Sequence, residues 1–317
     1  MYDARQKIRD GFASFVLALQ QNDLEAFDKV FCKDAVFETQ PFGNFQGTRE
    51  AKRRFCWQGP QLDVSRYKIY NNCIFAEEDH GLQSAYVVAL TGQLLDGYLH
   101  HFQFGGHYLI YWKKREGQWK IVRMKYCLDM EFGNTSFVAG WWKMIDYTVY
   151  GGYKNHPIQP AVDAPWRLYP QKRGWSEDEK IIDLYNRYAW GIDEDDFEIT
   201  ASALSEKAWA NIPGNAIPSK EALIAMLRSK RLKENTMSHV GKIVGVNRRD
   251  KTAELYVWRY EPHRIGTKIL HAGNMDRMYY SVDYIFHAII EDSEWKICQI
   301  DYQIGIFDAP VEDAVYQ

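Results

Sequence analysis

Histidine and carboxylate side chains are the residues of this chain whose types favour proton-transfer chemistry. Histidine titrates near neutral pH, so it can take up and return a proton under physiological conditions. Asp193 follows Ile192 at the end of a predicted apolar helix stripe, and His239 lies at the start of a predicted strand. A buried carboxylate beside a histidine fixes its tautomer and stabilises the imidazolium that forms. Proton abstraction is therefore the chemistry to weigh first.

Both residues also have an ordinary structural interpretation. A histidine at a strand edge is commonly a hydrogen-bonded structural residue. Asp193 is followed at once by Glu194, Asp195 and Asp196, and such a run is typical of a solvated turn or a helix cap. Only the first of these acids falls beside the apolar stripe, which is why Asp193 is the candidate.

A metal site and a nucleotide cofactor are not predicted. His100, His101 and His107 lie close in sequence, but adjacent strand residues point to opposite faces. No carboxylate or cysteine completes a set of ligands at the usual metal spacing. The chain also lacks a glycine-rich phosphate loop, a G-x-S-x-G elbow and a dinucleotide fingerprint.

Composition indicates an aromatic-rich globular protein. The 317 residues suit two domains, and 46% of them are hydrophobic, 15% aromatic and 26% charged. A net charge of only −3 gives no reason to expect nucleic acid or an anionic membrane as a partner. Five cysteines without a CxxC pair fit a reducing compartment. Since no secretory signal or long apolar span is seen, the predicted location is the cytoplasm, away from membranes.

Helices come first and strands after in the N-terminal half, which is typical of an α+β layer rather than a βαβ repeat. Apolar residues recur at helical spacing, and the period then changes to two. The predicted helices span residues 4–19, 24–31 and 48–55, and the predicted strands span 66–76, 84–95, 102–114 and 118–130.

A proline-rich segment separates two predicted domains. The first domain is placed at residues 1–150, the linker at 151–175 and the second domain at 176–317. Four of the ten prolines lie in the linker, so an extended connector is expected there. A short packing helix is expected over 136–150.

From Ser176 the same order of elements repeats. Ser176 and Glu179 form a capping-box signature, followed by a helix stripe, a third helix at Lys220–Arg228 and four strands. Both halves close on a hairpin with an acidic turn and the triplet Trp-Lys-Ile, at Trp119–Ile121 and Trp295–Ile297.

The repeat resembles the SnoaL-like branch of the nuclear transport factor 2-like superfamily. In the first half the resemblance is carried by NDLEAFDKVFCKDAVFE, GTREA and GQWKI. It implies two cone-shaped α+β barrels, each a curved antiparallel sheet covered by three N-terminal helices. This superfamily includes enzymes and non-catalytic modules, so the fold alone does not decide function.

The second half resembles the branch that contains scytalone dehydratase and hexachlorocyclohexane dehydrochlorinase, through LYNRYAWGIDEDDFE. The resemblance implies a catalytic dyad of Asp193 and His239 for β-elimination. Tyr185 or Tyr188 is the candidate electrophilic donor. The chain departs from the dehydrochlorinases after the last Trp-Lys pair, where Cys298 to Ile300 stand and no arginine follows. The substrate therefore stays open.

Further candidates for the pocket lie on the strands. Tyr256, Trp258 and Tyr280 are candidates in the second domain, although strand alternation lets only some face inward. The first domain has Gln20 in place of Asp193 and no histidine at the opening of its first long strand. Its candidate pocket residues, His107 and Asp129, come from later strands, and this domain is expected to be non-catalytic.

These observations predict a cofactor-independent lyase or isomerase acting on a small hydrophobic cyclic or aromatic molecule. A non-catalytic ligand-binding or assembly module and a polyketide-cyclase-like protein are the alternatives. The tandem is expected to form an intramolecular pseudo-dimer, with further homo-oligomerisation open.

Overall fold

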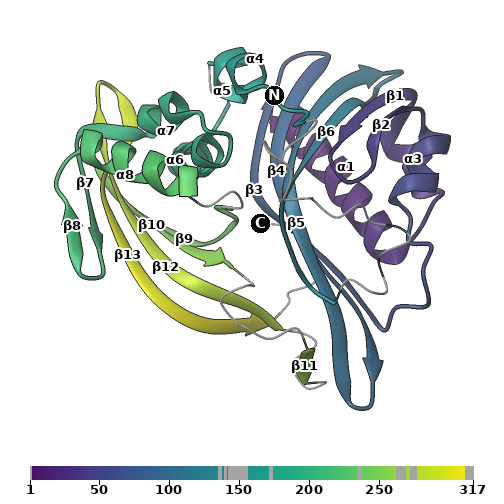
Figure 1. Cartoon of the computed structure of the whole chain (residues 1–317). Helices are drawn as coiled ribbons and strands as arrows, with labels where there is room; N and C mark the ends of the chain where they lie inside the picture. The colour runs from purple at the N-terminus through teal and green to yellow at the C-terminus, as the bar shows by residue number, and fades with distance from the viewer. Residues whose placement is uncertain are drawn as a thin grey trace. The chain divides into compact units, whose positions relative to one another are not determined.

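The computed structural model describes residues 2–134, 138, 141, 156–170, 174–233, 238–261, 269–271 and 277–310. The chain divides into two compact units (Figure 1). The first comprises Met1–Gln159, Thr267–Arg277 and Val311–Gln317, and the second comprises Pro160–Gly266 and Met278–Pro310. Within the described residues, no helix is both long and apolar enough to cross a membrane.

The first unit follows the predicted order of helices and strands. Its helices are α1 (Tyr2–Gln21), α2 (Ala26–Val30) and α3 (Thr48–Phe55). Its strands are β1 (Phe31–Thr39), β2 (Gly43–Gln46), β3 (Val64–Ala76), β4 (His80–Leu95), β5 (Tyr98–Arg115) and β6 (Gln118–Gly133).

The sheet of the first unit has the strand order β2-β1-β6-β5-β4-β3. All its pairings along this path are antiparallel except that of β1 with β6, which is parallel. Helix α1 packs its apolar stripe against one face, where Phe12 and Phe15 meet Tyr108 of β5 at ring distances of 5.9 and 6.4 Å. These rings bury large apolar areas and supply much of the core.

The second unit repeats the pattern. Its helices are α4 (Pro160–Asp163), α5 (Pro165–Leu168), α6 (Glu177–Asp193), α7 (Phe197–Ala203) and α8 (Lys220–Lys233). Its strands are β7 (Leu204–Ile212), β8 (Asn215–Ile217), β9 (Gly241–Arg249), β10 (Thr252–Tyr260), β12 (Arg277–Glu291) and β13 (Glu294–Pro310).

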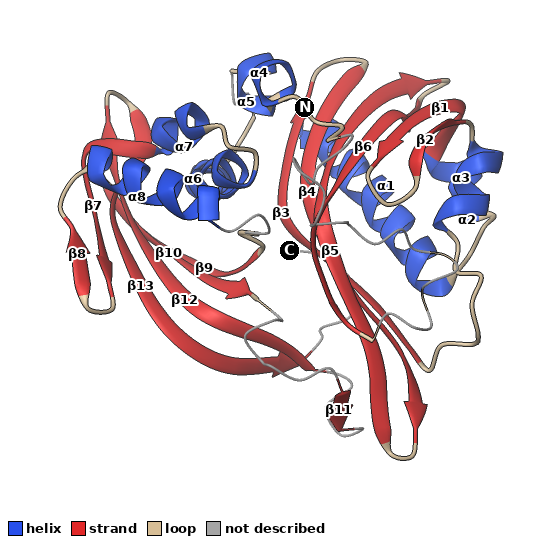
Figure 2. Ribbon diagram, viewed as in Figure 1, coloured by secondary structure: helices blue, strands red, loops and turns tan. Residues whose placement is uncertain are grey.

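The sheet of the second unit has the order β8-β7-β13-β12-β10-β9, which matches the first sheet strand for strand. Again one pairing, β7 with β13, is parallel. In the first unit α1 and α3, and in the second unit α6, α7 and α8, lie against one face of the sheet (Figure 2). The expected α+β architecture of two similar units is therefore confirmed, with one parallel pair added to each sheet.

Helix α6 begins where the sequence predicts. The Ser176 side chain accepts a hydrogen bond from the Glu179 N–H at 3.2 Å, and the Glu179 carboxylate accepts one from the Ser176 N–H at 2.8 Å. This capping box satisfies backbone donors that the first helical turn leaves unpaired.

The linker is less extended than predicted. Prolines block a helix interior but suit its first turn, and Pro160 and Pro165 begin the short helices α4 and α5. Trp166 of α5 donates to buried Asp183 of α6 at 2.7 Å, so this part of the linker packs on the second unit. The helix expected over 136–150 lies outside the described residues apart from Val138 and Trp141, which are in turns.

Strand β11 (Ile269–His271) pairs with the start of β5, with Leu270 opposite Leu99. A segment from the second half of the sequence thus extends the sheet of the first unit.

Candidate active site

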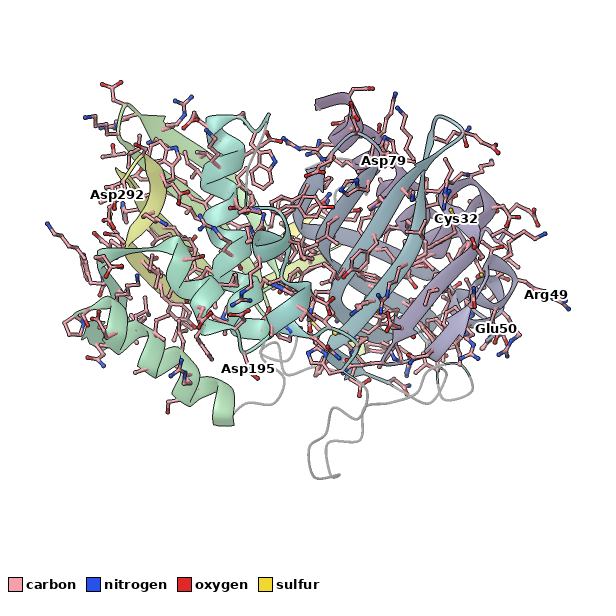
Figure 3. The ribbon with its side chains drawn as sticks, turned by 90° about the horizontal axis from the view of Figure 1, so that it is seen from above. Cys32, Arg49, Glu50, Asp79, Asp195 and Asp292 are labelled. Carbon is pink, nitrogen blue, oxygen red and sulfur yellow. The ribbon has the colours of Figure 1, made fainter. Side chains whose placement is uncertain are left out.

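Asp193 is the last residue of α6, and its side chain is buried while the acids after it have other roles. Asp195 is exposed in the turn after α6, with a backbone φ of 56°, and is labelled in Figure 3. Asp196 caps α7 and accepts a hydrogen bond from Ile199 N. The acidic residues after α6 therefore have different roles, and only Asp193 is considered further as a catalytic group.

Asp193 and His239 are hydrogen-bonded to each other. His239 Nδ1 lies 2.7 Å from Asp193 Oδ1, and the His239 backbone N–H donates to Asp193 Oδ2 at 2.9 Å. Only 1% of each side chain is exposed. One carboxylate therefore fixes both the ring and the backbone of His239. This arrangement assigns the proton of the neutral imidazole to Nδ1 and leaves Nε2 as the basic nitrogen.

Tyr185 holds the backbone of the same segment. Its hydroxyl donates to the His239 carbonyl oxygen at 2.7 Å. Gly241 permits this approach, because a Cβ there would lie 2.4 Å from the Tyr185 hydroxyl oxygen. Since its proton is used in this bond, Tyr185 positions His239 and is a poor candidate for the electrophilic donor.

Tyr188 lies against the imidazole and has a different environment. Its ring meets the His239 ring edge-on, with centroids 5.9 Å apart at 89°. Among the described residues, no hydrogen bond is made by the Tyr188 hydroxyl. Burial raises its pKa well above 10, so the hydroxyl keeps its proton. Of the two predicted tyrosine donors, Tyr188 is the one with a proton to offer.

Arg259 of β10 completes the group and was missed by the sequence interpretation. Its Nε donates to Ser238 O at 2.8 Å, next to His239, and its Nη2 lies 3.0 Å from Glu261 Oε1. The guanidinium also interacts with the buried Tyr284, whose pKa it lowers against the larger effect of burial. Burial opposes the charge, but Tyr284 and Glu261 raise the pKa of Arg259 above its usual range.

The buried pair leaves His239 neutral at physiological pH. Burial lowers the pKa of the imidazole from 6.5, and the nearby charge of Arg259 lowers it further. The bond to Asp193 acts in the opposite direction without offsetting these effects. A neutral histidine with Nε2 unprotonated is the form that can accept a proton.

A comparison with known protein families bears on this site. The model of the SnoaL-like domain matches residues 1–125 and again residues 175–301. The chain belongs to the SnoaL-like family. Both matches fall on the repeats, so the protein is a tandem of two SnoaL-like domains, as the sequence motifs predict.

Solved structures that are similar to part of the chain have low sequence identity to it. A type 2 hexachlorocyclohexane dehydrochlorinase is 15% identical, with a TM-score of 0.36 over 41% of this chain and 88% of its own. A putative scytalone dehydratase from Novosphingobium aromaticivorans is 20% identical, with a TM-score of 0.37 over 42% and 91%. A putative aromatic ring hydroxylase from the same organism is 21% identical, with a TM-score of 0.37 over 43% and 96%. No curated protein matches the chain.

The predicted pocket residues of the second SnoaL-like unit lie on the other face of its sheet. Leu255 and Val257 belong to the core below α6, so their neighbours Tyr256 and Trp258 point away from it. Tyr280 shares that face, because a bulge in β12 makes it the partner of Tyr260 and places its ring 5.7 Å from Trp258. These three residues are therefore not brought to the dyad. Strand alternation instead directs Arg259 inward.

His107 and Asp129 of the first unit are brought together, but not in its core. Tyr108 faces α1, so its neighbour His107 points to the opposite face of the sheet. There His107 Nδ1 lies 2.8 Å from Asp129 Oδ1 and 3.0 Å from Oδ2. The expectation that they line the pocket of the first unit is wrong for this reason.

Proposed function

We propose that the second SnoaL-like unit is a cofactor-independent lyase or isomerase in which His239 is the general base and Asp193 its orienting partner. The observation that carries this proposal is the 2.7 Å bond between His239 Nδ1 and Asp193 Oδ1, with both side chains 1% exposed. This bond fixes the tautomer of His239 with Nε2 as the basic nitrogen, which is the arrangement that a general base requires.

The proposed reaction begins with proton transfer from carbon to His239 Nε2. The electron pair of the C–H bond moves into the substrate, either to expel a leaving group from the adjacent carbon or to form an enolate. The imidazolium, stabilised by Asp193, then returns the proton to the leaving oxygen, which departs as water, or to another carbon. The first outcome is a dehydration and the second an isomerisation, and neither needs a cofactor.

Two groups near His239 suit the charge that develops on the substrate. The Tyr188 hydroxyl can donate a hydrogen bond to a carbonyl oxygen as it becomes an enolate. Arg259 supplies a fixed positive charge of the kind that the dehydrochlorinase motif carries after its last Trp-Lys pair, but from another strand. Because Arg259 is already bonded to Ser238 and Glu261, we expect it to act on the substrate through the electrostatic field of its charge.

The proposed substrate is small, cyclic and largely apolar. The side chains around His239 on the inner face are mainly aromatic. Phe286 packs 5.3 Å from both Tyr185 and Tyr188, and Tyr284 lies 5.2 Å from Phe286 and from Tyr302. Aromatic surroundings of this kind favour flat or ring-shaped ligands and exclude water from the charged transition state.

The test is hydrogen–deuterium exchange at the acidic carbon of simple cyclic ketones. Cyclohexanone and α-tetralone in deuterated buffer report proton abstraction by NMR, whatever the natural leaving group is. The wild-type chain is expected to accelerate exchange for at least one ketone, and His239→Gln to lose about 10²–10⁴-fold of that acceleration.

The matched control is His287→Gln. His287 is also paired with a carboxylate, at 2.9 Å from Asp301 Oδ2, but it lies on the same outer face as Glu254 and is 29% exposed. This variant is expected to retain the wild-type rate. Absence of acceleration by the wild type, or equal rates in wild type and His239→Gln, would contradict the proposal.

A further inference from the structure

The linker between the two SnoaL-like repeats contains a short helix that contacts the helix carrying Asp193. Helix α5 lies outside residues 175–301, which match the family model, but it belongs to the second compact unit. Two adjacent side chains of α5, those of Trp166 and Arg167, bind α6 and the segment that follows it. Asp193 is the last residue of α6, so these contacts bear on the position of the proposed dyad.

Trp166 contacts α6 at two points. Its indole Nε1 donates a hydrogen bond to Asp183 Oδ1 at 2.7 Å, and its ring packs on Trp190 with the centroids 6.0 Å apart. Asp183 and Trp190 are seven residues apart, so they lie on the same side of α6 about two turns from each other. All three side chains are buried. The indole therefore holds the second half of α6 from outside its apolar stripe.

Arg167 binds the residue that begins the next helix. Its guanidinium pairs with both carboxylate oxygens of Asp196, with Nη2 2.9 Å from Oδ1, and Nη2 also lies 3.0 Å from Glu198 Oε2. Asp196 is at the same time the N-cap of α7, where it accepts a hydrogen bond from the Ile199 N–H. A bidentate arginine–carboxylate pair is strong and directional, and the Asp196 side chain is only 6% exposed. One carboxylate therefore joins α5 to the start of α7.

The two contacts lie on either side of Asp193 in the chain. Trp190 stands three residues before Asp193 and Asp196 three residues after it, and adjacent residues of α5 hold both. A shift of the last turn of α6 would therefore break a contact with α5. Asp193 binds both the ring and the backbone of His239, an arrangement that tolerates little displacement. We propose that Trp166 and Arg167 are positioning residues that hold Asp193 against His239.

This positioning role rests on the proposed function of the dyad, but its structural effect can be measured without a substrate. Asp193 Oδ1 keeps the imidazole proton of His239 on Nδ1. When Asp193 is displaced, part of the His239 rings should carry the proton on Nε2 instead. Such rings cannot act as the base, so kcat should fall while KM changes little.

The experiment uses the full-length chain with ¹⁵N-labelled histidine. Asp196→Asn is the first variant, because asparagine can still cap α7 but forms no ion pair with Arg167. Arg167→Gln removes the same ion pair from the other side. We expect each variant to show both tautomers of His239 at pH 7.5 and to lower kcat for ketone exchange by about 10–100-fold.

Two further variants separate the contacts of α5. Trp166→Leu removes the bond to Asp183 and the ring contact with Trp190, and it is expected to show both tautomers as well. Arg167→Lys keeps the charge beside Asp196 but loses the planar fork, so it should recover part of the rate that Arg167→Gln loses. Recovery by lysine would not be expected if Arg167 acted only by filling space.

Arg248→Gln is the matched control. Arg248 Nε donates to Asp178 Oδ1 at 3.0 Å, so this arginine pairs with the first turn of the same helix, at the end far from Asp193. The control should keep the wild-type tautomer and rate, and circular dichroism shows whether each variant is folded. The wild-type tautomer in folded Asp196→Asn and Arg167→Gln, or an equal change in Arg248→Gln, would overturn the positioning role. If the wild type does not accelerate exchange, the proposed function fails, and the tautomers alone decide whether α5 positions Asp193.

Discussion

Gln20 of α1 accepts a hydrogen bond through Oε1 from the backbone N–H of Tyr67, at 3.0 Å. In the second unit, Asp193 accepts the same kind of bond from the His239 N–H at 2.9 Å. In each unit, a side chain at the end of the long helix therefore accepts a hydrogen bond from the chain at or just before the start of the corresponding edge strand, β3 or β9. In the first unit the Gln20 amide stands in place of the Asp193 carboxylate, and the Tyr67 phenol in place of the His239 imidazole. Burial raises the pKa of Tyr67 far above neutral pH, so it keeps its proton.

This difference predicts that proton transfer is confined to the second unit. Tyr67→Phe removes the only titratable group of the Gln20–Tyr67 pair, and we expect ketone exchange at the wild-type rate. The same assay with His239→Gln is the positive comparison. A large loss of exchange in a folded Tyr67→Phe variant would show that the first unit takes part in the chemistry.

Asp193→Asn is predicted to retain the fold but lose most of the activity. The amide oxygen can still accept from the His239 N–H, but the NH₂ group then faces Nδ1 and forces the imidazole proton onto Nε2. Nε2 can no longer act as a base, and the exchange rate should fall by about 10²–10⁴-fold. Asp193→Ala is the stability comparison, since an unpaired buried N–H costs about 1–3 kcal/mol in the free energy of unfolding.

The two helix tyrosines are predicted to respond differently to loss of their hydroxyl groups. Tyr185→Phe removes the 2.7 Å bond to His239 O and should lower the free energy of unfolding by about 0.5–1.5 kcal/mol. Tyr188→Phe removes a hydroxyl that makes no hydrogen bond to the described residues, so stability should change little. The exchange rate should nevertheless fall in Tyr188→Phe. A wild-type rate in that variant would remove Tyr188 from the proposed mechanism.

Arg259 is predicted to affect both stability and the titration of His239. Arg259→Met removes the ion-pair partner of the buried Glu261 carboxylate, which costs about 3–5 kcal/mol in the free energy of unfolding. The double variant Arg259→Met/Glu261→Leu should recover most of that loss. The double variant removes both charges, and Arg259 lowers the pKa of His239 by more than Glu261 raises it. The pKa of His239 should therefore rise, and the acidic limb of the rate profile should move to higher pH. An acidic limb at the same pH as in the wild type would show that Arg259 does not lower the pKa of His239.

The lowered pKa of His239 predicts a specific dependence of stability on pH. The unfolded chain takes up a proton on this residue near pH 6.5, whereas the folded chain does so only at lower pH. Between these two values the unfolded state binds more protons, so the free energy of unfolding should fall as pH decreases from 6.5, by at most about 1.4 kcal/mol per pH unit. His239→Gln should lack this slope when denaturation is followed across that range.

Sequence periodicity predicts most of the fold, because long helices with apolar stripes and long alternating strands are the strongest signals available. The parallel pairing of β1 with β6 could not be predicted in this way, since it joins segments about 90 residues apart along the chain. The short helices in the linker were missed because proline was interpreted as a breaker, although it also begins helices.

The candidate site was predictable in part. Asp193 stands out as the one acid beside the apolar stripe. Arg259 could also have been predicted, because it continues the inward alternation of Leu255 and Val257 along the same strand. Tyr256 and Trp258 could have been assigned to the outer face by the same alternation, but Tyr280 could not, because the bulge that reverses its direction has no clear mark in the sequence.

The protonation state of the His239 ring is the most direct test of its role as the base, and its measurement needs no substrate. NMR of ¹⁵N-labelled histidine, assigned by comparison with His239→Gln, reports which ring nitrogen carries the proton and at what pH the ring titrates. We expect a neutral ring at pH 7.5 with the proton on Nδ1, Nε2 unprotonated, and a pKa below 6.5. A ring protonated on Nε2, or one that titrates at or above 6.5, would contradict the assignment of His239 as the base.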